Sequence, residues 1–188
     1  MTSQEALKRL VAGNERFVAD KLDGQLQDSS RRTALTGGQQ PYAIILSCAD
    51  SRVVPELAFD TGLGEIFVVR VAGNIANTES IASMEYAVAH LGTKLIVVMG
   101  HESCGAVGAA IAGGDNGHNL NQLVAHITPA IAASNDGASV NDIVKKNAVL
   151  NAEALLIRSP IIANAVKNDG VEIMSAYYNM DSGKVDFM

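Results

Sequence analysis

The stretch AIILSCADSR, residues 43–52, decides how this 188-residue chain is organised. It begins with an apolar run that ends in a serine, and a short run of this kind is typical of a strand buried on both faces. A thiol, a carboxylate and a guanidinium then stand at alternate positions, as Cys48, Asp50 and Arg52. Because alternate residues of an extended segment share one face, we expect these three groups to lie together at the end of a strand.

Further strands and helices alternate along the rest of the chain. Apolar runs over 65–71, 94–99 and 171–178 predict three more strands, and a turn at 181–183 leads to a short final strand at 185–187. The predicted helices are one from a Thr2–Glu5 capping box to Val18, a short one closed by Gly37-Gly38, and others over 78–91, 105–112, 119–133, 140–157 and 160–167. This alternation predicts an α/β fold: a mostly parallel central sheet flanked by helices on both faces, with a C-terminal edge strand or hairpin.

The length and composition of the chain fit one domain. Hydrophobic residues make up 48% and charged residues 18% of the sequence, which is typical of a compact globular protein with a real core. No internal repeat and no linker interrupts the pattern. We therefore expect a single domain over 1–188, with an N-terminal helical arm at 1–35 and an α/β core at 40–188.

Charge and hydropathy exclude several classes of partner. The net charge of -6 argues against binding to nucleic acid or to an anionic membrane, because phosphate groups are bound by basic surfaces. No apolar run approaches the ~20 residues of a membrane span. The N-terminal segment Met1–Glu5 shows no basic region followed by an apolar stretch, so we expect a cytoplasmic protein, with a periplasmic location after signal removal as the alternative.

A second unusual segment, GHESCG at residues 100–105, follows the strand predicted at 94–99. The carboxyl ends of parallel strands meet at one edge of a sheet, so Cys48, His101 and Cys104 are expected to converge. Two thiolates and one imidazole suit Zn²⁺, which prefers soft sulfur and borderline nitrogen ligands. Three protein ligands leave a fourth position for water or for Asp50, and an exchangeable fourth ligand is typical of a catalytic zinc site.

Other interpretations of this cluster stay open at this point. Either cysteine could be an ordinary buried residue. A disulfide between them is also possible, although it leaves His101, Asp50 and Arg52 without a role. Asp50 as a permanent fourth ligand would make a closed structural zinc site. The glycine-bearing segment 100–108 could bind phosphate, but it lacks both the Lys-Ser/Thr pair of a P-loop and the G-x-G-x-x-G spacing.

Two motifs resemble those of the β-class carbonic anhydrases: CADSR at 48–52 and HESCG at 101–105. The resemblance is strongest over about 35–112, where it also includes GQQP, EIFVVRVAGN and SMEYAVAHLG. Members of this family hydrate CO₂ reversibly to bicarbonate and a proton. The resemblance therefore implies a zinc-dependent carbonate dehydratase that uses a zinc-bound hydroxide, on a mostly parallel sheet flanked by helices.

The resemblance also assigns roles to individual residues. It implies that Cys48, His101 and Cys104 bind the zinc ion. Asp50 and Arg52 correspond to the catalytic aspartate–arginine pair of the family, and Asp50 is expected to be a fourth zinc ligand only in a closed state.

The substrate pocket is less closely defined by the sequence. By resemblance, Gln39, Phe67 and Tyr86 are expected to line it, and Gly105 lets the backbone approach the substrate closely. The chain departs from many members of the family at Val71–Gly73, where those members have Asn-Val/Ile-Ala. It also contains no tryptophan, so a regulatory bicarbonate site built on that residue is absent.

The resemblance implies an assembly of identical subunits, a homodimer or a homotetramer, in which N-terminal helices contact the partner. Two other functions stay open. One is a zinc hydrolase of the same fold that acts on CS₂ or COS. The other is a non-catalytic protein that binds zinc or senses redox state through its cysteines.

Overall fold

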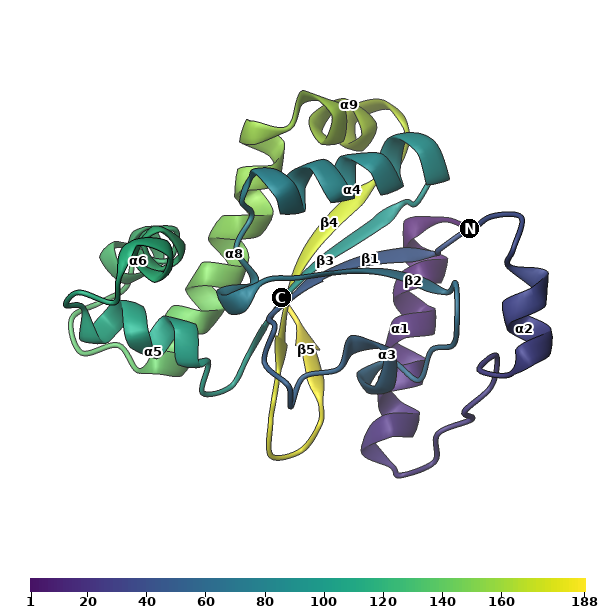
Figure 1. The fold of residues 1–188 in the computed structure, drawn as a ribbon, viewed down its shortest axis with the longest axis horizontal. Coiled ribbons are helices and arrows are strands. Elements are labelled where there is room, and N and C mark those ends of the chain that lie inside the picture. The colour runs from purple at the N-terminus through teal and green to yellow at the C-terminus, as the bar shows by residue number, and fades with distance from the viewer.

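A five-stranded sheet with the strand order β2-β1-β3-β4-β5 forms the centre of the computed structural model, which describes residues 1–188 (Figure 1). Strands β1 (Ala43–Ser47), β2 (Ile66–Arg70), β3 (Leu95–His101) and β4 (Glu172–Tyr178) are parallel, and β5 (Val185–Phe187) pairs with β4 in the antiparallel sense. The predicted fold class is confirmed.

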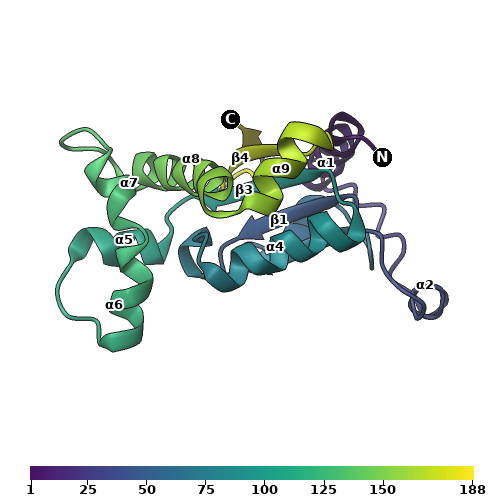
Figure 2. The same cartoon turned by 90° about the horizontal axis from the view of Figure 1, so that it is seen from above.

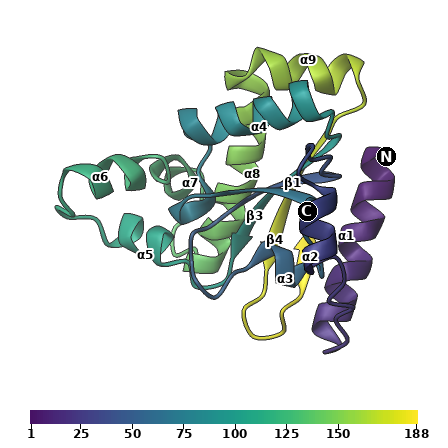
Figure 3. The ribbon, with the colours of Figure 1, turned by 45° about the vertical axis from the view of Figure 1, so that its right-hand side comes forward.

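Helices cover both faces of this sheet (Figure 3). Helices α1 (Ser3–Val18) and α3 (Pro55–Ala58) pack on one face. Helices α4 (Thr78–Leu91), α8 (Val140–Arg158) and α9 (Pro160–Asn168) pack on the other. The sheet is therefore the middle of three layers, as expected for parallel strands that are apolar on both sides.

Strand β1 shows why its sequence is a continuous apolar run. Ile45 packs in the same cluster as Leu10 of α1, whereas Ile44 packs in the opposite cluster with Met84 of α4. All residues of the strand are buried. Successive side chains of a strand point to opposite faces, so burial of both faces requires apolar residues at every position.

The remaining helices lie beyond the two ends of the sheet (Figure 2). Helices α5 (Gly105–Ala112), α6 (His118–Ala125) and α7 (Thr128–Ala132) form a group beyond the carboxyl ends of the strands. Helix α2 (Ser29–Ala34) lies at the opposite end. A short 3₁₀ turn, η1 (Ala72–Asn74), follows β2.

A few predicted boundaries are wrong. The single helix predicted over 119–133 is two helices, α6 and α7, because Pro129 in the first turn of α7 has no N–H to continue the preceding helix. Strand β3 is longer than predicted, so that His101 is its last residue and does not follow it. Helix α3 and the turn η1 were not predicted, since each is only one turn long.

The N-terminal helix α1 packs against the sheet through Ala6 and Leu10. The division into an arm at 1–35 and a core at 40–188 stays a prediction. Taken singly, none of the helices has the length and apolar composition of a membrane span, whereas α8 and α9 together, bent by 92°, meet that criterion by length and composition.

Candidate metal centre

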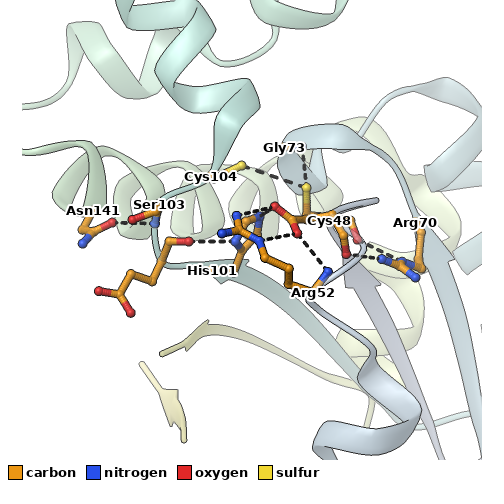
Figure 4. Close-up of polar contacts among 10 residues, drawn as sticks. Cys48, Arg52, Arg70, Gly73, His101, Ser103, Cys104 and Asn141 are labelled. Carbon is orange, nitrogen blue, oxygen red and sulfur yellow. Dashed lines mark hydrogen bonds and ion pairs between the residues drawn. The ribbon is translucent and has the colours of Figure 1, made fainter. Parts of the chain in front are cut away.

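The two motifs meet at the carboxyl edge of the sheet, where Cys48, His101 and Cys104 come together (Figure 4). Cys48 follows β1, His101 ends the neighbouring strand β3, and Cys104 is the N-cap of α5. Their ligand atoms all lie within 4.8 Å of one another, and all three residues are buried. The two sulfurs are 4.0 Å apart and both cysteines are free, so the structure contradicts a disulfide.

His101 is oriented as a metal ligand would be. Its Nδ1 lies 2.9 Å from the carbonyl oxygen of Glu102, and a proton on Nδ1 would donate to that oxygen and leave a lone pair on Nε2. Nε2 is buried and has no hydrogen-bond partner. Buried polar atoms are normally paired, and histidines that bind metals usually donate their other N–H to a carbonyl or carboxylate. The donor set therefore fits a thiophilic metal ion.

The two thiols influence each other's ionisation. The neighbouring Cys104 thiol lowers the pKa of Cys48 against the opposing effect of burial, with help from His101 and the Gly73 N–H. The pKa of Cys104 is raised, first by the adjacent Cys48 and then by burial. Only the first proton is therefore released easily, because a second thiolate at this distance meets the charge of the first. A cation between the sulfurs would remove this repulsion.

Asp50 lies beside the cluster and is held by Arg52. The guanidinium donates to both carboxylate oxygens, with Nε 3.0 Å from Oδ1 and Nη2 2.8 Å from Oδ2, and the Arg52 N–H lies 3.0 Å from Oδ1. These bonds to Arg52 hold the pKa of the Asp50 carboxyl well below its usual range. Oδ2 is also 3.8 Å from Nε2 of His101. The structure thus shows the arginine-paired position of Asp50, and its role as a fourth ligand stays a prediction.

Two side chains outside the set of predicted site residues hold the ligand loops in place. Arg70, at the end of β2, donates to the carbonyl oxygens of Cys48 at 2.9 Å and of Asp50 at 2.7 Å. Asn141 of α8 accepts the N–H of Ser103 at 2.9 Å, and Ser103 has a φ of 54°. The position of Arg70, a charged residue at the end of an apolar strand, indicates a structural role from the sequence alone. No local sequence pattern indicates the role of Asn141.

The residues predicted to bind substrate do not all reach this cluster. Gly105 starts α5 directly after Cys104. Gln39 precedes β1 and so lies at the opposite end of the sheet. Phe67 lies on the edge strand β2, where it pairs with Ile44 of β1, and it packs toward α4. Tyr86 projects from α4 and is 49% exposed. Within one chain only Gly105 adjoins the ligands, and the substrate-binding role of the other three stays a prediction.

An α/β sheet with a buried Cys-His-Cys cluster at its carboxyl edge defines a candidate metalloenzyme, and comparison with known proteins identifies its family. A family model described as carbonic anhydrase matches residues 43–185. The chain is 40% identical over 185 residues to carbonic anhydrase 2 of Mycobacterium tuberculosis, covering 95% of this chain and 89% of the relative. It is 36% identical to a carbonic anhydrase of Mycolicibacterium smegmatis, covering 96% and 91%.

Solved structures agree with the sequence relatives. A Coccomyxa β-carbonic anhydrase in complex with acetazolamide superposes with a TM-score of 0.77 at 27% identity, covering 96% of this chain and 85% of that one. A tetrameric β-carbonic anhydrase of Sordaria macrospora has the same fold, with a TM-score of 0.76 at 24% identity and coverage of 98% and 97%. The chain belongs to the β-class carbonic anhydrase family, as its two motifs predicted.

Proposed function

We propose that this protein catalyses the reversible hydration of CO₂ to bicarbonate and a proton, with one Zn²⁺ bound by Cys48, His101 and Cys104. The observation that carries the proposal is the convergence of these three ligand atoms within 4.8 Å of one another, on the fold of a carbonic anhydrase. Zinc binds readily to sulfur and imidazole nitrogen, whereas magnesium and calcium prefer oxygen ligands.

Zinc, when bound, supplies an acidified water, because it lowers the pKa of a coordinated water from ~15.7 to ~7. The residues of this chain orient the reaction. The ionised Asp50 carboxylate lies 3.8 Å from Nε2 of His101 and is placed to accept a hydrogen bond from a water at the cluster. Arg52 keeps that carboxylate ionised and fixes its direction through two side-chain hydrogen bonds.

The surroundings of the cluster suit an apolar substrate. Ile75, Val107 and Ile127 pack with Cys48 and Cys104 in one buried hydrophobic cluster. CO₂ carries no charge, so an apolar wall admits it without a desolvation penalty. The Asp50–Arg52 pair lies at the open side of the cluster, where the Arg52 side chain is 55% exposed and the Asp50 side chain is 17% exposed.

We also propose that the protein works as a homodimer or homotetramer and acts in the cytoplasm, with the periplasm after signal removal as the alternative location. The tetrameric β-carbonic anhydrases of Sordaria macrospora support an assembly of identical subunits. Light scattering coupled to size-exclusion chromatography distinguishes a dimer from a tetramer by mass.

The test of the proposed function combines metal analysis with stopped-flow CO₂ hydration. Wild-type protein should contain one zinc per chain and hydrate CO₂, and Cys48→Ser should lose both properties, because a hydroxyl is a far poorer zinc ligand than a thiolate. Zinc-loaded wild type that hydrates no CO₂ at any pH would contradict the proposal and favour a binding or sensing role. Turnover of COS or CS₂ alone would favour the hydrolase. The relatives, which are carbonic anhydrases, support neither alternative.

A further inference from the structure

Two buried asparagines of α8 hold the segment that follows β2. Asn147, which is 1% exposed, donates from Nδ2 to the carbonyl oxygen of Gly73 at 2.9 Å. One turn later, Asn151 accepts the N–H of Ala76 at 2.6 Å and donates back to the side chain of Asn147 at 3.0 Å. The segment is therefore fixed at both of its ends by one face of a helix. Satisfied buried polar networks of this kind make the backbone that they bind rigid.

The same segment touches the metal centre. The N–H of Gly73 donates to Sγ of Cys48 at 3.3 Å (Figure 4). Gly73 has a φ of 73°, and a Cβ at this position would lie 2.8 Å from Cδ1 of Ile127. Glycine is thus required both by the backbone conformation and by the space. This residue belongs to Val71–Gly73, the stretch at which the sequence departs from many members of the family.

A hydrogen bond to a thiolate changes how that sulfur binds a metal. The N–H withdraws electron density from the sulfur and limits the directions from which its lone pairs are available. We propose that Asn147 is a positioning residue that holds the Gly73 N–H on the Cys48 sulfur and so weakens electron donation from that sulfur to the metal. The inference rests on Cys48 being a metal ligand, as in the proposed function.

The proposal predicts the direction in which the pH dependence of CO₂ hydration changes when Asn147 is lost. Two thiolates make a bound metal a weaker Lewis acid than neutral ligands would, and the Gly73 N–H offsets part of this effect for one of them. The Gly73 N–H donates to Cys48 Sγ, so the offset that Asn147 supports acts on the Cys48 sulfur. Loss of Asn147 should therefore strengthen donation from Cys48 and raise the pH at which CO₂ hydration reaches half of its maximum.

The experiment uses full-length protein loaded with Co²⁺, whose sulfur-to-metal charge-transfer band reports electron donation directly. Asn147→Asp keeps the shape of the side chain but replaces the donor with an acceptor, and Asn147→Leu removes both. We expect both variants to shift the band to longer wavelength and to raise the pH midpoint of hydration by the zinc enzyme.

Asn14→Leu is the matched control. Asn14 is also buried and donates to two backbone carbonyl oxygens, of Ala58 and Gly183, both at 2.9 Å, but it lies far from the ligands. It should lower the melting temperature and leave the band and the pH midpoint unchanged. An unshifted band in folded Asn147 variants, with only a loss of stability like that of the control, would overturn the inference.

A measurement on wild type keeps the inference testable if neither Asn147 variant folds. In protein loaded with ¹¹³Cd, the Gly73 amide proton should show a scalar coupling to the metal through the sulfur, and absence of that coupling would also overturn the inference. The same spectra distinguish failure of the proposed function from failure of this inference. Wild type without any sulfur-to-cobalt band would show that Cys48 is not a metal ligand. A band that is present but does not shift in the variants would refute only the role of Asn147.

Discussion

Two of the five buried side-chain polar atoms without a hydrogen-bond partner lie at opposite ends of the sheet: Nε2 of His101 and the hydroxyl of Tyr42. His101 ends β3 at the carboxyl edge, and Tyr42 immediately precedes β1 at the amino edge. The side chain of His101 faces two thiols within 4.8 Å. The ring of Tyr42 instead packs under the guanidinium of Arg9, whose carbon lies 4.5 Å from the ring centroid.

The difference between these two regions shows which features distinguish a metal-binding site from an ordinary unpaired buried atom. A single unpaired buried atom costs about 1–3 kcal/mol wherever it lies, and so it marks no function by itself. At His101 the unpaired atom belongs to a set of three metal-binding donors from two loops. At Tyr42 no second donor of that kind is present. We therefore expect substitutions at the carboxyl edge to change chemistry and those at the amino edge to change stability.

The largest effect is expected from His101→Ala. This substitution removes one of three metal ligands, so zinc content should fall. CO₂ hydration should drop by more than ~100-fold, because loss of a residue that only supports a ligand already costs about 10–100-fold. Metal analysis and stopped-flow hydration of the purified variant measure both. A variant that keeps one zinc per chain and full activity would place the metal elsewhere.

Asp50→Asn should separate metal binding from turnover. Asparagine keeps the size of the side chain but loses the charge that Arg52 binds and that accepts a hydrogen bond from water. We expect zinc content to stay at the wild-type level while hydration falls roughly 100-fold, within the range for loss of a positioned acid–base group. Unchanged hydration would show that the carboxylate does not take part in the reaction.

A smaller effect is expected from Asn141→Ala, which removes the acceptor for the Ser103 N–H. Ser103 then keeps its positive φ without support, so the loop between His101 and Cys104 should loosen, and zinc affinity should fall about 10-fold. Asn121→Ala is the control, because Asn121 also accepts a backbone N–H, from Asn116 at 3.0 Å, but on α6. Equal zinc affinities in the two variants would refute the role of Asn141.

Tyr42→Phe should have the smallest effect, and on stability alone. Removing the unpaired hydroxyl should raise the free energy of unfolding at pH 7 by ~1 kcal/mol. Burial raises the pKa of Tyr42 from 10.0 to about 12. Because the folded-state pKa is the higher one, Tyr42 contributes stability that is complete below pH 10 and is lost as the pH rises toward 12, by roughly 2–3 kcal/mol at 1.36 kcal/mol per unit.

Urea unfolding of wild type and Tyr42→Phe at pH 7 and pH 11 measures this effect. The variant should lose less stability between the two pH values than wild type does, while its CO₂ hydration stays unchanged. The same alkaline loss in both proteins would show that the hydroxyl ionises as readily in the folded chain as in the unfolded one.

The sequence predicted those parts of the molecule that depend on local pattern. Strand β1 and helices α4 and α5 have the predicted boundaries, since apolar periodicity and terminal glycines are local signals. The convergence of Cys48 with His101 followed from one rule, that parallel strands open at a common edge.

The parts that were not predicted depend on contacts between distant residues. Asn147 bonds to Gly73 across 74 positions of sequence, and no local pattern encodes that pairing. The family motifs suggested roles for Gln39 and Tyr86 but not their locations. The structure places both away from the ligands of their own chain.

The central claim is that two loops, distant in sequence, bind one zinc ion through two sulfurs and one imidazole. X-ray absorption at the zinc edge of the wild-type protein tests it most directly. The spectrum should require two sulfur atoms at about 2.3 Å and an imidazole nitrogen at about 2.0–2.1 Å from each zinc. A spectrum fitted by one sulfur or none would contradict the claim.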